Sequence, residues 1–179
     1  MTYPWAAGEV LTAADLNAYA GLVHINTTTI GAGVASVTVS NVFSAQFYNY
    51  RIVLSSMDAS TAVIIQFTFV SQSGNFYGNR LELNNTTTTV TNVNTGVSGV
   101  AYAEIGRTST SNQGFATFDV YSPNFARRKG VTGNYYGAGY NGTCGYEQNV
   151  TNAYTGFVLT PSTGTLEGGN IYVYGYNNG

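Results

Sequence analysis

The chain has 179 residues, of which six are basic and eight are acidic, so that only 8% of its residues are charged. Soluble domains typically contain about 25% charged residues, and this deficit excludes the basic surface that nucleic-acid binding requires. The apolar content of 44% is ordinary and is enough to form a core. Because so few charges keep separate molecules apart, the composition favours a protein whose surface is covered by copies of itself or by partners.

The amino-terminal sequence contains no targeting signal. Residues 1–21 lack the basic start and the continuous apolar stretch of a signal peptide. No stretch approaches the roughly 18 apolar residues of a membrane span. We therefore expect no contact with a membrane, and assembly in the cytoplasm in which the chain is made.

A short helix is predicted from residue 12 onward. Thr12 is a suitable N-cap, and Asp15 stands three residues later, where a carboxylate favours the positive end of a helix. Leu11 and Leu16 occupy the positions of a hydrophobic staple, and Gly21 can end the helix. A helix of two turns is not stable alone in water. It must therefore dock on its own β domain or on a neighbouring subunit.

An aromatic arm precedes this helix. Tyr3, Pro4 and Trp5 form either an anchor that fills a pocket of a partner or an arm that folds over the chain's own core. Within the helix, Leu16 and Tyr19 lie on one face. The residues expected to anchor the chain or to contact sister subunits are Tyr3, Pro4, Trp5, Leu11, Leu16 and Tyr19.

From about residue 30 the hydrophobic pattern changes to alternation with frequent turns, which is typical of short β-strands. This pattern predicts an all-β protein, a β-sandwich or jelly roll of about eight or nine strands, preceded by one short α-helix. Residues 1–30 are assigned to the anchoring arm and helix, and residues 31–179 to the β-sandwich domain. The expected strands are 34–40, 50–55, 62–72, 80–83, 97–105, 114–121, 135–140, 153–159 and 170–176.

Two uncharged segments leave alternatives open. Residues 84–95 are rich in Asn and Thr and indicate either an exposed loop or an edge strand. Residues 134–145 are rich in Tyr and Gly and indicate either a loop or a wide hairpin. Tyr, Gly and Asn together are typical of adaptable binding loops.

Groups suited to catalysis are few and scattered. His24, the single histidine, lies among apolar residues and is interpreted as a packed residue rather than a general base. Cys144, the single cysteine, excludes an intrachain disulfide and has no histidine near it in sequence. The run 127–129 is interpreted as a solvated loop rather than a phosphate site. No phosphate-loop, zinc or calcium motif is present.

The carboxylates stand singly, and two of them could meet across a sheet as a glycosidase pair, although no spacing requires it. We therefore expect no enzymatic activity, no catalytic residue, no metal and no cofactor. The carboxylates that follow the predicted helix are Asp58, Glu82, Glu104, Asp119, Glu147 and Glu167.

Carbohydrate binding has more support in the sequence, because flat aromatic faces beside amide groups suit a sugar ring. The alternative is that the same tyrosines pack against a neighbouring copy of the chain. The candidate ligand-binding residues are Asn134, Tyr135, Tyr136, Tyr140, Asn141 and Tyr146.

Three segments carry a family resemblance. Residues 5–18, WAAGEVLTAADLNA, resemble the short amino-terminal motif of many tail-fibre and minor tail proteins of tailed bacteriophages. Residues 42–55, VFSAQFYNYRIVLS, and 168–175, GGNIYVYG, are similar to strands of β-sandwich modules in phage virions. The resemblance implies a homo-oligomer, commonly a trimer, that contacts other virion proteins and carries no enzymatic residues.

From the residues and the resemblance together we expect a non-enzymatic structural protein located in the virion. The favoured role is a short tail fibre or tail-associated protein whose β domain binds a glycan or a protein on the host surface. The alternative is a capsid decoration (cement) protein or a head spike that stabilises the shell. The chain departs from a typical fibre because it has no long shaft of coiled coil or repeats.

Overall fold

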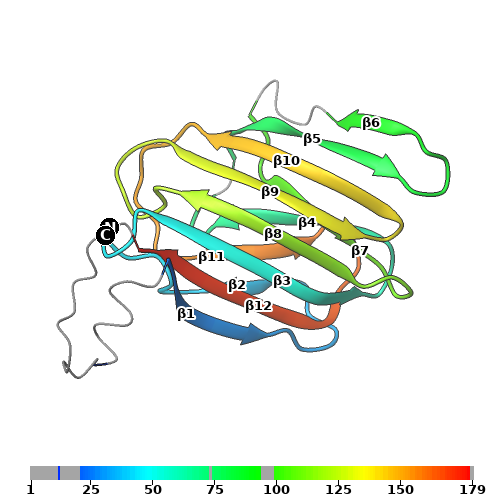
Figure 1. The fold of residues 1–179 in the computed structure, drawn as a ribbon, viewed down its shortest axis with the longest axis horizontal. Helices are drawn as coiled ribbons and strands as arrows, with labels where there is room; N and C mark the ends of the chain where they lie inside the picture. Colours follow the sequence, from blue (N-terminus) through cyan, green and yellow to red (C-terminus); the bar gives the residue numbers. More distant parts are fainter. Residues whose placement is uncertain (1–11, 13–20, 73, 94–98, 178–179) are drawn as a thin grey trace, which may run out of the picture.

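The computed structural model describes residues 12, 21–72, 74–93 and 99–177. Within these residues the chain forms twelve strands, no helix, and two antiparallel sheets that face one another (Figure 1). No helix long and apolar enough to cross a membrane is found among them. The β-sandwich expected from the sequence is confirmed for this part of the chain.

The larger sheet has eight strands, and every neighbouring pair in it is antiparallel. Figure 1 views the molecule with this sheet in front. In spatial order its strands are β1 (Leu22–Thr29), β12 (Leu166–Tyr176), β3 (Asn49–Ala59), β8 (Gly114–Tyr121), β9 (Lys129–Gly137), β10 (Tyr140–Gln148), β5 (Phe76–Asn84) and β6 (Val90–Val93).

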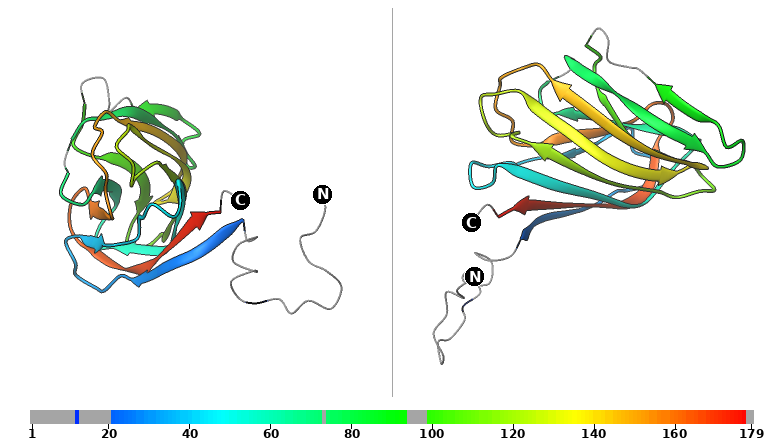
Figure 2. Two further views of the ribbon diagram at one scale, coloured as in Figure 1. Left: turned by 90° about the vertical axis from the view of Figure 1, so that its left-hand side faces the viewer. Right: turned by 45° about the horizontal axis from the view of Figure 1, so that its top comes forward.

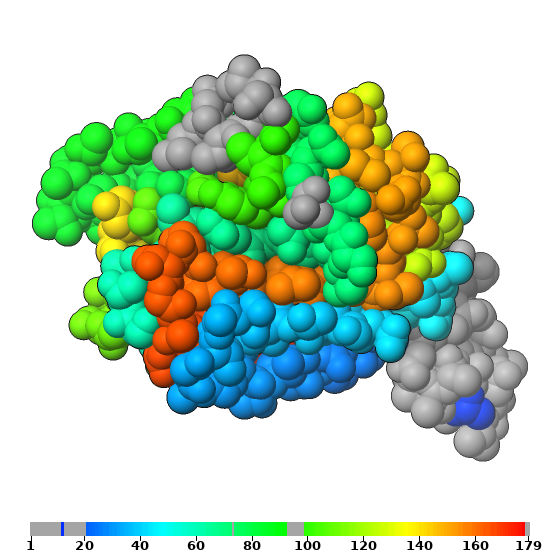
Figure 3. Space-filling model, turned by 180° about the vertical axis from the view of Figure 1, so that it is seen from behind, coloured from blue at the N-terminus to red at the C-terminus, as the bar shows by residue number. Residues whose placement is uncertain are grey.

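The smaller sheet has four strands and covers the inner face of the larger one (Figure 2). Seen from behind, β11 in orange lies beside the blue segment that contains β2 (Figure 3). In spatial order its strands are β2 (Val37–Val39), β11 (Phe157–Pro161), β4 (Val63–Phe69) and β7 (Ala103–Thr108).

The chain alternates between the two sheets along most of its length. Successive strands from β1 to β4 lie in the large, small, large and small sheets in turn, and the same alternation runs from β11 to β12. Two hairpins interrupt it, β5–β6 and β9–β10, and both add strands to the same side of the large sheet. These hairpins account for the four strands by which the large sheet exceeds the small one.

Local sequence explains the hairpin β9–β10. Its turn consists of Ala138 and Gly139, both with positive φ, which is the backbone conformation of a two-residue turn that matches the strand twist. The hairpin β5–β6 turns differently: the side-chain oxygen of Asn84 accepts hydrogen bonds from the backbone amides of Thr86 and Thr87.

The core between the sheets is built around aromatic rings. Phe67 of β4 is fully buried and meets four other phenylalanine rings at centroid distances of 5.1–6.4 Å. These rings come from both sheets, so one side chain ties β4 and β11 to β5 and β8. The four partners are Phe69, Phe76, Phe118 and Phe157.

The strand expectations are corrected in number and in position. The described residues hold twelve strands rather than eight or nine, because the amino-terminal strand β1, the edge strand β6 and the strand β10 were not among those expected. For residues 84–95 the edge-strand alternative holds over Val90–Val93, and for 134–145 the hairpin alternative holds.

The sandwich also begins earlier than the boundary expected at residue 30. Strand β1 pairs with β12 from Leu22 to Thr29, so these residues belong to the large sheet. The helix predicted between residue 12 and Gly21 falls outside the described residues, apart from Thr12. The aromatic arm, with Tyr3, Pro4 and Trp5, falls outside them as well.

Candidate functional site

The outer face of the large sheet presents two parallel rows of side chains that cross the strands. The register places five residues of neighbouring strands side by side in a first row, here called the floor row: Val53, Thr117, Asn134, Thr143 and Leu81. The next row along the strands, here called the aromatic row, contains Phe115, Tyr136, Asn141, Leu83 and Val90. Cross-strand neighbours share one face of a sheet, so both rows line the same surface.

Two shallow hollows lie over these rows. The first, of about 560 Å³, spans β3, β8 and β9 and has Phe115 and Tyr136 on one side. The second, of about 420 Å³, spans β9, β10, β5 and β6 and is lined by Leu81, Val90 and Asn141. Asn134 lines both hollows. The two hollows therefore meet at the centre of the sheet, on β9.

The hollows are hydrophobic at their sides and polar without charge at their base. Phe115 and Tyr136 stand directly opposite each other on β8 and β9, and 44% and 49% of their surfaces are exposed. Exposed apolar side chains that adjoin one another, unlike single ones, are typical of interaction sites. In the described part of the chain, the side chains of Asn134 and Asn141 form no hydrogen bond. Their amides are free to bind a ligand.

A third row borders the floor row on the side away from the aromatic row, and it contains the charged groups nearest to the hollows. Arg51 donates two hydrogen bonds of 2.9 Å to the carboxylate of Asp119. The hydroxyl of Tyr176 donates a further bond of 2.7 Å to Asp119, and burial and this bond raise the pKa of Tyr176 to about 12. The two charges thus neutralise each other beside the first hollow.

The structure divides the six candidate ligand-binding residues between two faces. Asn134, Tyr136 and Asn141 lie on the outer face and line the hollows. Tyr135 and Tyr146 are buried on the inner face, because successive residues of a strand point to opposite sides. Tyr140 also points inward, with the guanidinium of Arg107 4.2 Å from its ring centroid. The shelf of four tyrosines expected from the sequence therefore does not form.

The expected anchoring residues fall outside the described residues. Nothing in the described structure locates them, and their role stays a prediction. They are Tyr3, Pro4, Trp5, Leu11, Leu16 and Tyr19.

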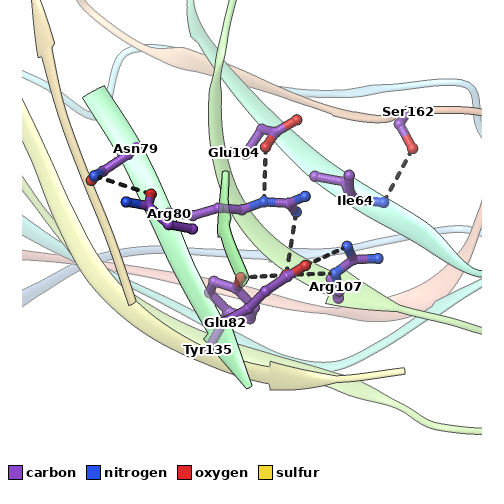
Figure 4. A network of polar contacts seen from close by, with 9 residues as sticks. Ile64, Asn79, Arg80, Glu82, Glu104, Arg107, Tyr135 and Ser162 are labelled. Carbon is purple, nitrogen blue, oxygen red and sulfur yellow. Dashed lines mark hydrogen bonds and ion pairs between the residues drawn. The ribbon is translucent and has the colours of Figure 1, made fainter. Parts of the chain in front are cut away.

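A second polar cluster lies inside the sandwich, between β5, β7 and β9 (Figure 4). Arg107 donates two hydrogen bonds of 2.8 Å to the carboxylate of Glu82, and the hydroxyl of Tyr135 donates one of 2.9 Å to it. The Nε of Arg80 lies 2.9 Å from Oε2 of Glu104, an ion pair without the alignment of a hydrogen bond. The sequence did not predict this cluster. It links the edge strand of the small sheet to the large sheet.

The two carboxylates of this cluster have opposite pKa shifts. Burial alone would raise the pKa of Glu82, but the hydrogen bonds from Arg107 and the charge of Arg80 outweigh it, so its pKa is lowered. Burial raises the pKa of Glu104, and the charges of Arg80 and Arg107 offset this only in part. The difference follows from the geometry, because only Glu82 accepts aligned hydrogen bonds.

The pH dependence of stability follows from these shifts. Glu82 stabilises the fold fully above its ordinary pKa of 4.5, and this contribution is lost as pH falls through its lower folded value. Glu104 acts oppositely, since stability rises as pH falls through its raised folded value toward 4.5. We predict that Glu82→Gln makes the free energy of unfolding fall less steeply as pH decreases below 4.5. Glu104→Gln should remove the increase in stability that the unaltered protein shows as pH falls toward 4.5. Urea unfolding from pH 7 to pH 3 measures both, and a Glu82→Gln curve parallel to the unaltered protein would contradict the assignment.

The remaining ionic groups are largely satisfied within the molecule. Arg128 forms an exposed ion pair with Glu147 at 2.7 Å. Lys129, expected in a solvated loop, is instead buried, and its ammonium donates to the backbone carbonyls of Phe125 and Arg127. Four of the five arginines therefore face a carboxylate: Arg51, Arg80, Arg107 and Arg128.

The single histidine and the single cysteine have structural surroundings. His24, expected to be packed, is exposed on β1, where its ring meets the edge of Tyr174 and hydrogen-bonds the hydroxyl of Thr27. Cys144 is buried, and burial raises the pKa of its thiol to about 12, so the thiolate needed for reactivity is not formed at neutral pH. Among residues 21–177 that the structure describes, no three His, Cys, Asp or Glu side chains gather as a metal site would require.

Comparison of the chain with protein-family models, with curated proteins and with solved structures finds no match. The assignment of a function therefore depends on the geometry of the outer face and on the sequence itself.

Proposed function

We propose that the chain is a non-enzymatic structural protein of a bacteriophage virion, a short tail fibre or tail-associated protein that binds the host surface through the outer face of its large sheet. One observation carries the binding role: two adjoining hollows lined by exposed aromatic rings and unpaired amides. The virion setting is supported by the resemblance of residues 5–18 to the amino-terminal motif of phage tail proteins.

The finer fold proposed is a jelly roll. When the hairpin β9–β10 and the hairpin β5–β6 are set aside, the large sheet has the order β1-β12-β3-β8 and the small sheet β2-β11-β4-β7. Numbered again as eight strands, these are the orders 1-8-3-6 and 2-7-4-5, which two interlocked Greek keys produce. Capsid and lectin domains often have this architecture, an analogy that agrees with the proposal.

A homo-oligomer, with the trimer as the favoured state, is part of the proposal. The charge distribution supports it, because most of the few ionic groups pair within the chain and leave an almost uncharged surface. Such a surface offers little repulsion between copies. Carrying several copies of the binding face would also raise the avidity for a host cell without tight individual contacts.

The non-enzymatic role is supported by the surroundings of Glu82 and Glu104, two carboxylates that lie near each other in the fold. Glu82 and Glu104 share Arg80, and both are buried between the two sheets. A glycosidase pair needs one carboxylate on each side of a substrate bond. Here Arg80 contacts both carboxylates, so the two do not flank a space for a substrate bond.

The role of a capsid decoration protein is the second candidate, and the edges of the large sheet favour it. Strand β1, LVHINTTT, and strand β6, VTNV, contain no Asp, Glu, Lys, Arg or Pro. Edge strands without charges or proline pair readily with other chains, as clamping neighbouring shell subunits would require. Counting copies of the chain per purified particle separates the two candidates, since a cement protein is present in hundreds of copies and a tail fibre in few.

The anchoring role is tested by a double substitution. Trp5→Ala with Leu11→Ala is predicted to leave the β domain folded and to abolish incorporation into particles, because the apolar contacts of the arm are lost. Immunoblots of purified particles measure incorporation, and circular dichroism of the isolated variant reports its fold. Phe115→Ala, on the outer face, is the control and should be incorporated normally. Normal incorporation of the double variant would refute the anchoring role.

A further inference from the structure

The floor row runs without interruption beneath both hollows. Its residues come from five adjacent strands, β3, β8, β9, β10 and β5. Adjacent strands lie about 4.8 Å apart, so the row extends for about 19 Å. Three of its five side chains, Thr117, Asn134 and Thr143, are polar, short and uncharged. The surface is therefore suited to an extended ligand that lies across the strands.

The aromatic row forms one side of this track. Phe115 and Tyr136 present adjacent exposed rings over the first hollow, and Val90, 63% exposed, stands at the far end of the second. Rings of this kind pack against the C–H faces of a sugar ring and bury apolar area. Both hollows are open and shallow, so an extended ligand can continue past either end of the track.

The polar groups of the track are neutral donors and acceptors. An amide such as that of Asn134 or Asn141 offers two N–H donors and one carbonyl acceptor, which matches the hydroxyl and acetamido groups of a glycan. The side-chain hydroxyl of Thr117 forms no hydrogen bond within the described part of the chain. Thr143 donates to the backbone carbonyl of Gly133 at 3.0 Å, and its oxygen can still accept. Every one of these groups is able to pair with an uncharged hydroxyl.

No charged side chain reaches the track. The single carboxylate beneath the second hollow, Glu82, points inward and is held by Arg107 and Tyr135. Arg51 and Asp119, in the bordering row, neutralise each other. An anionic polysaccharide would find no positive charge to pair with in the track. The charged side chains of an acidic or basic peptide would lose water of hydration without gaining an ion pair.

We infer that the two hollows form one continuous site for an uncharged oligosaccharide that crosses β9 over Asn134. The inference depends on the proposed host-binding function and specifies its ligand class. Two residues line both hollows, Asn134 and Tyr135, and of these Asn134 is the one that faces outward. Tyr136 supplies the stacking surface beside it.

The test uses the full chain, fluorescently labelled, and heat-killed cells of the bacterium that the phage infects. Binding is measured at low and high salt, after periodate oxidation of the cells, and after protease treatment. The cell-surface polysaccharide is also separated on an anion exchanger into a neutral and an anionic fraction, and each is used as a competitor. We expect binding that salt and protease leave unchanged, that periodate abolishes, and that the neutral fraction alone competes away.

Variants locate the site on the outer face. Asn134→Ala and Tyr136→Ala are each expected to weaken binding about tenfold, the effect of losing one such contact. Tyr121→Ala removes a tyrosine that is 39% exposed on the same face but outside both hollows, and should bind normally. Equal effects of Tyr136→Ala and Tyr121→Ala would overturn the proposed location.

The outcomes separate the inference from the function on which it depends. Binding that protease abolishes and periodate spares would identify a protein receptor, and the glycan inference would fail while host binding stands. Competition by the anionic fraction, with binding that high salt weakens, would also overturn it. A full chain that does not bind the cells at all would remove the proposed function itself.

Discussion

Replacing Glu82 by Gln is expected to lower the free energy of unfolding by about 3–5 kcal/mol, the usual cost of removing one partner of a buried ion pair. The carboxylate of Glu82 is 4% exposed and accepts hydrogen bonds from Arg107 and Tyr135. Gln keeps the shape of the side chain but removes its charge. The positive charge of Arg107 then has no carboxylate partner inside the sandwich, and Arg80 keeps only Glu104. Urea unfolding monitored by tyrosine fluorescence measures the change.

The exposed ion pair between Arg128 and Glu147 provides the control. Glu147→Gln makes the same chemical change where 49% of the side chain is exposed, and should alter stability by less than about 1 kcal/mol. Equal losses for Glu82→Gln and Glu147→Gln would show that the buried cluster does not stabilise the junction of the two sheets.

Phe67→Ala is expected to cost about 3–5 kcal/mol, because it leaves a cavity where four other rings meet. Phe67 has no exposed surface and belongs to the small sheet, while Phe76 and Phe118 belong to the large one. Removing it weakens the contact between the sheets rather than a single strand. Thermal unfolding of the variant measures the loss.

Phe115→Ala is the matched control for the core substitution. Phe115 lies on β8, three residues before Phe118, but points outward and is 44% exposed. Its removal should change stability little and binding strongly. A large loss of stability in Phe115→Ala, or a small one in Phe67→Ala, would reverse the assignment of inner and outer faces.

Strands with plain alternation could be predicted from the sequence. The range expected for 114–121 agrees with β8, where Ala116, Phe118 and Val120 are buried and the residues between them face outward. Strand β1 was missed because its sequence, LVHINTTT, is short of apolar residues and follows a predicted helix. At an edge of the sheet, pairing with β12 on one side is sufficient to hold it.

The buried cluster could not be predicted, since alternation does not say which side of a strand faces the core. In Arg80-Leu81-Glu82 the ordinary rule would bury the leucine and expose the charges. The structure does the reverse: Arg80 and Glu82 are 4% exposed and Leu81 is 44% exposed. The reversal depends on Arg107 and Glu104 of β7, which reach β5 only through the tertiary fold.

The candidate site was predicted only in part, because the sequence does not show which side of a strand faces outward. Composition identified the segment 134–145, and Asn134, Tyr136 and Asn141 of that segment do line the hollows. The alternation along β9 and β10 turned Tyr135 and Tyr146 inward. Phe115, Thr117 and Leu81 come from β8 and β5, and only the register of the sheet brings them beside Asn134.

The most direct measurement is the rate at which phage particles adsorb to host cells when the chain carries Asn134→Ala with Tyr136→Ala. The account predicts particles with the normal number of copies whose adsorption is slowed at least about tenfold, while Tyr121→Ala particles adsorb normally. Normal adsorption of particles that contain the double variant would contradict the claim that the outer face of the large sheet binds the host.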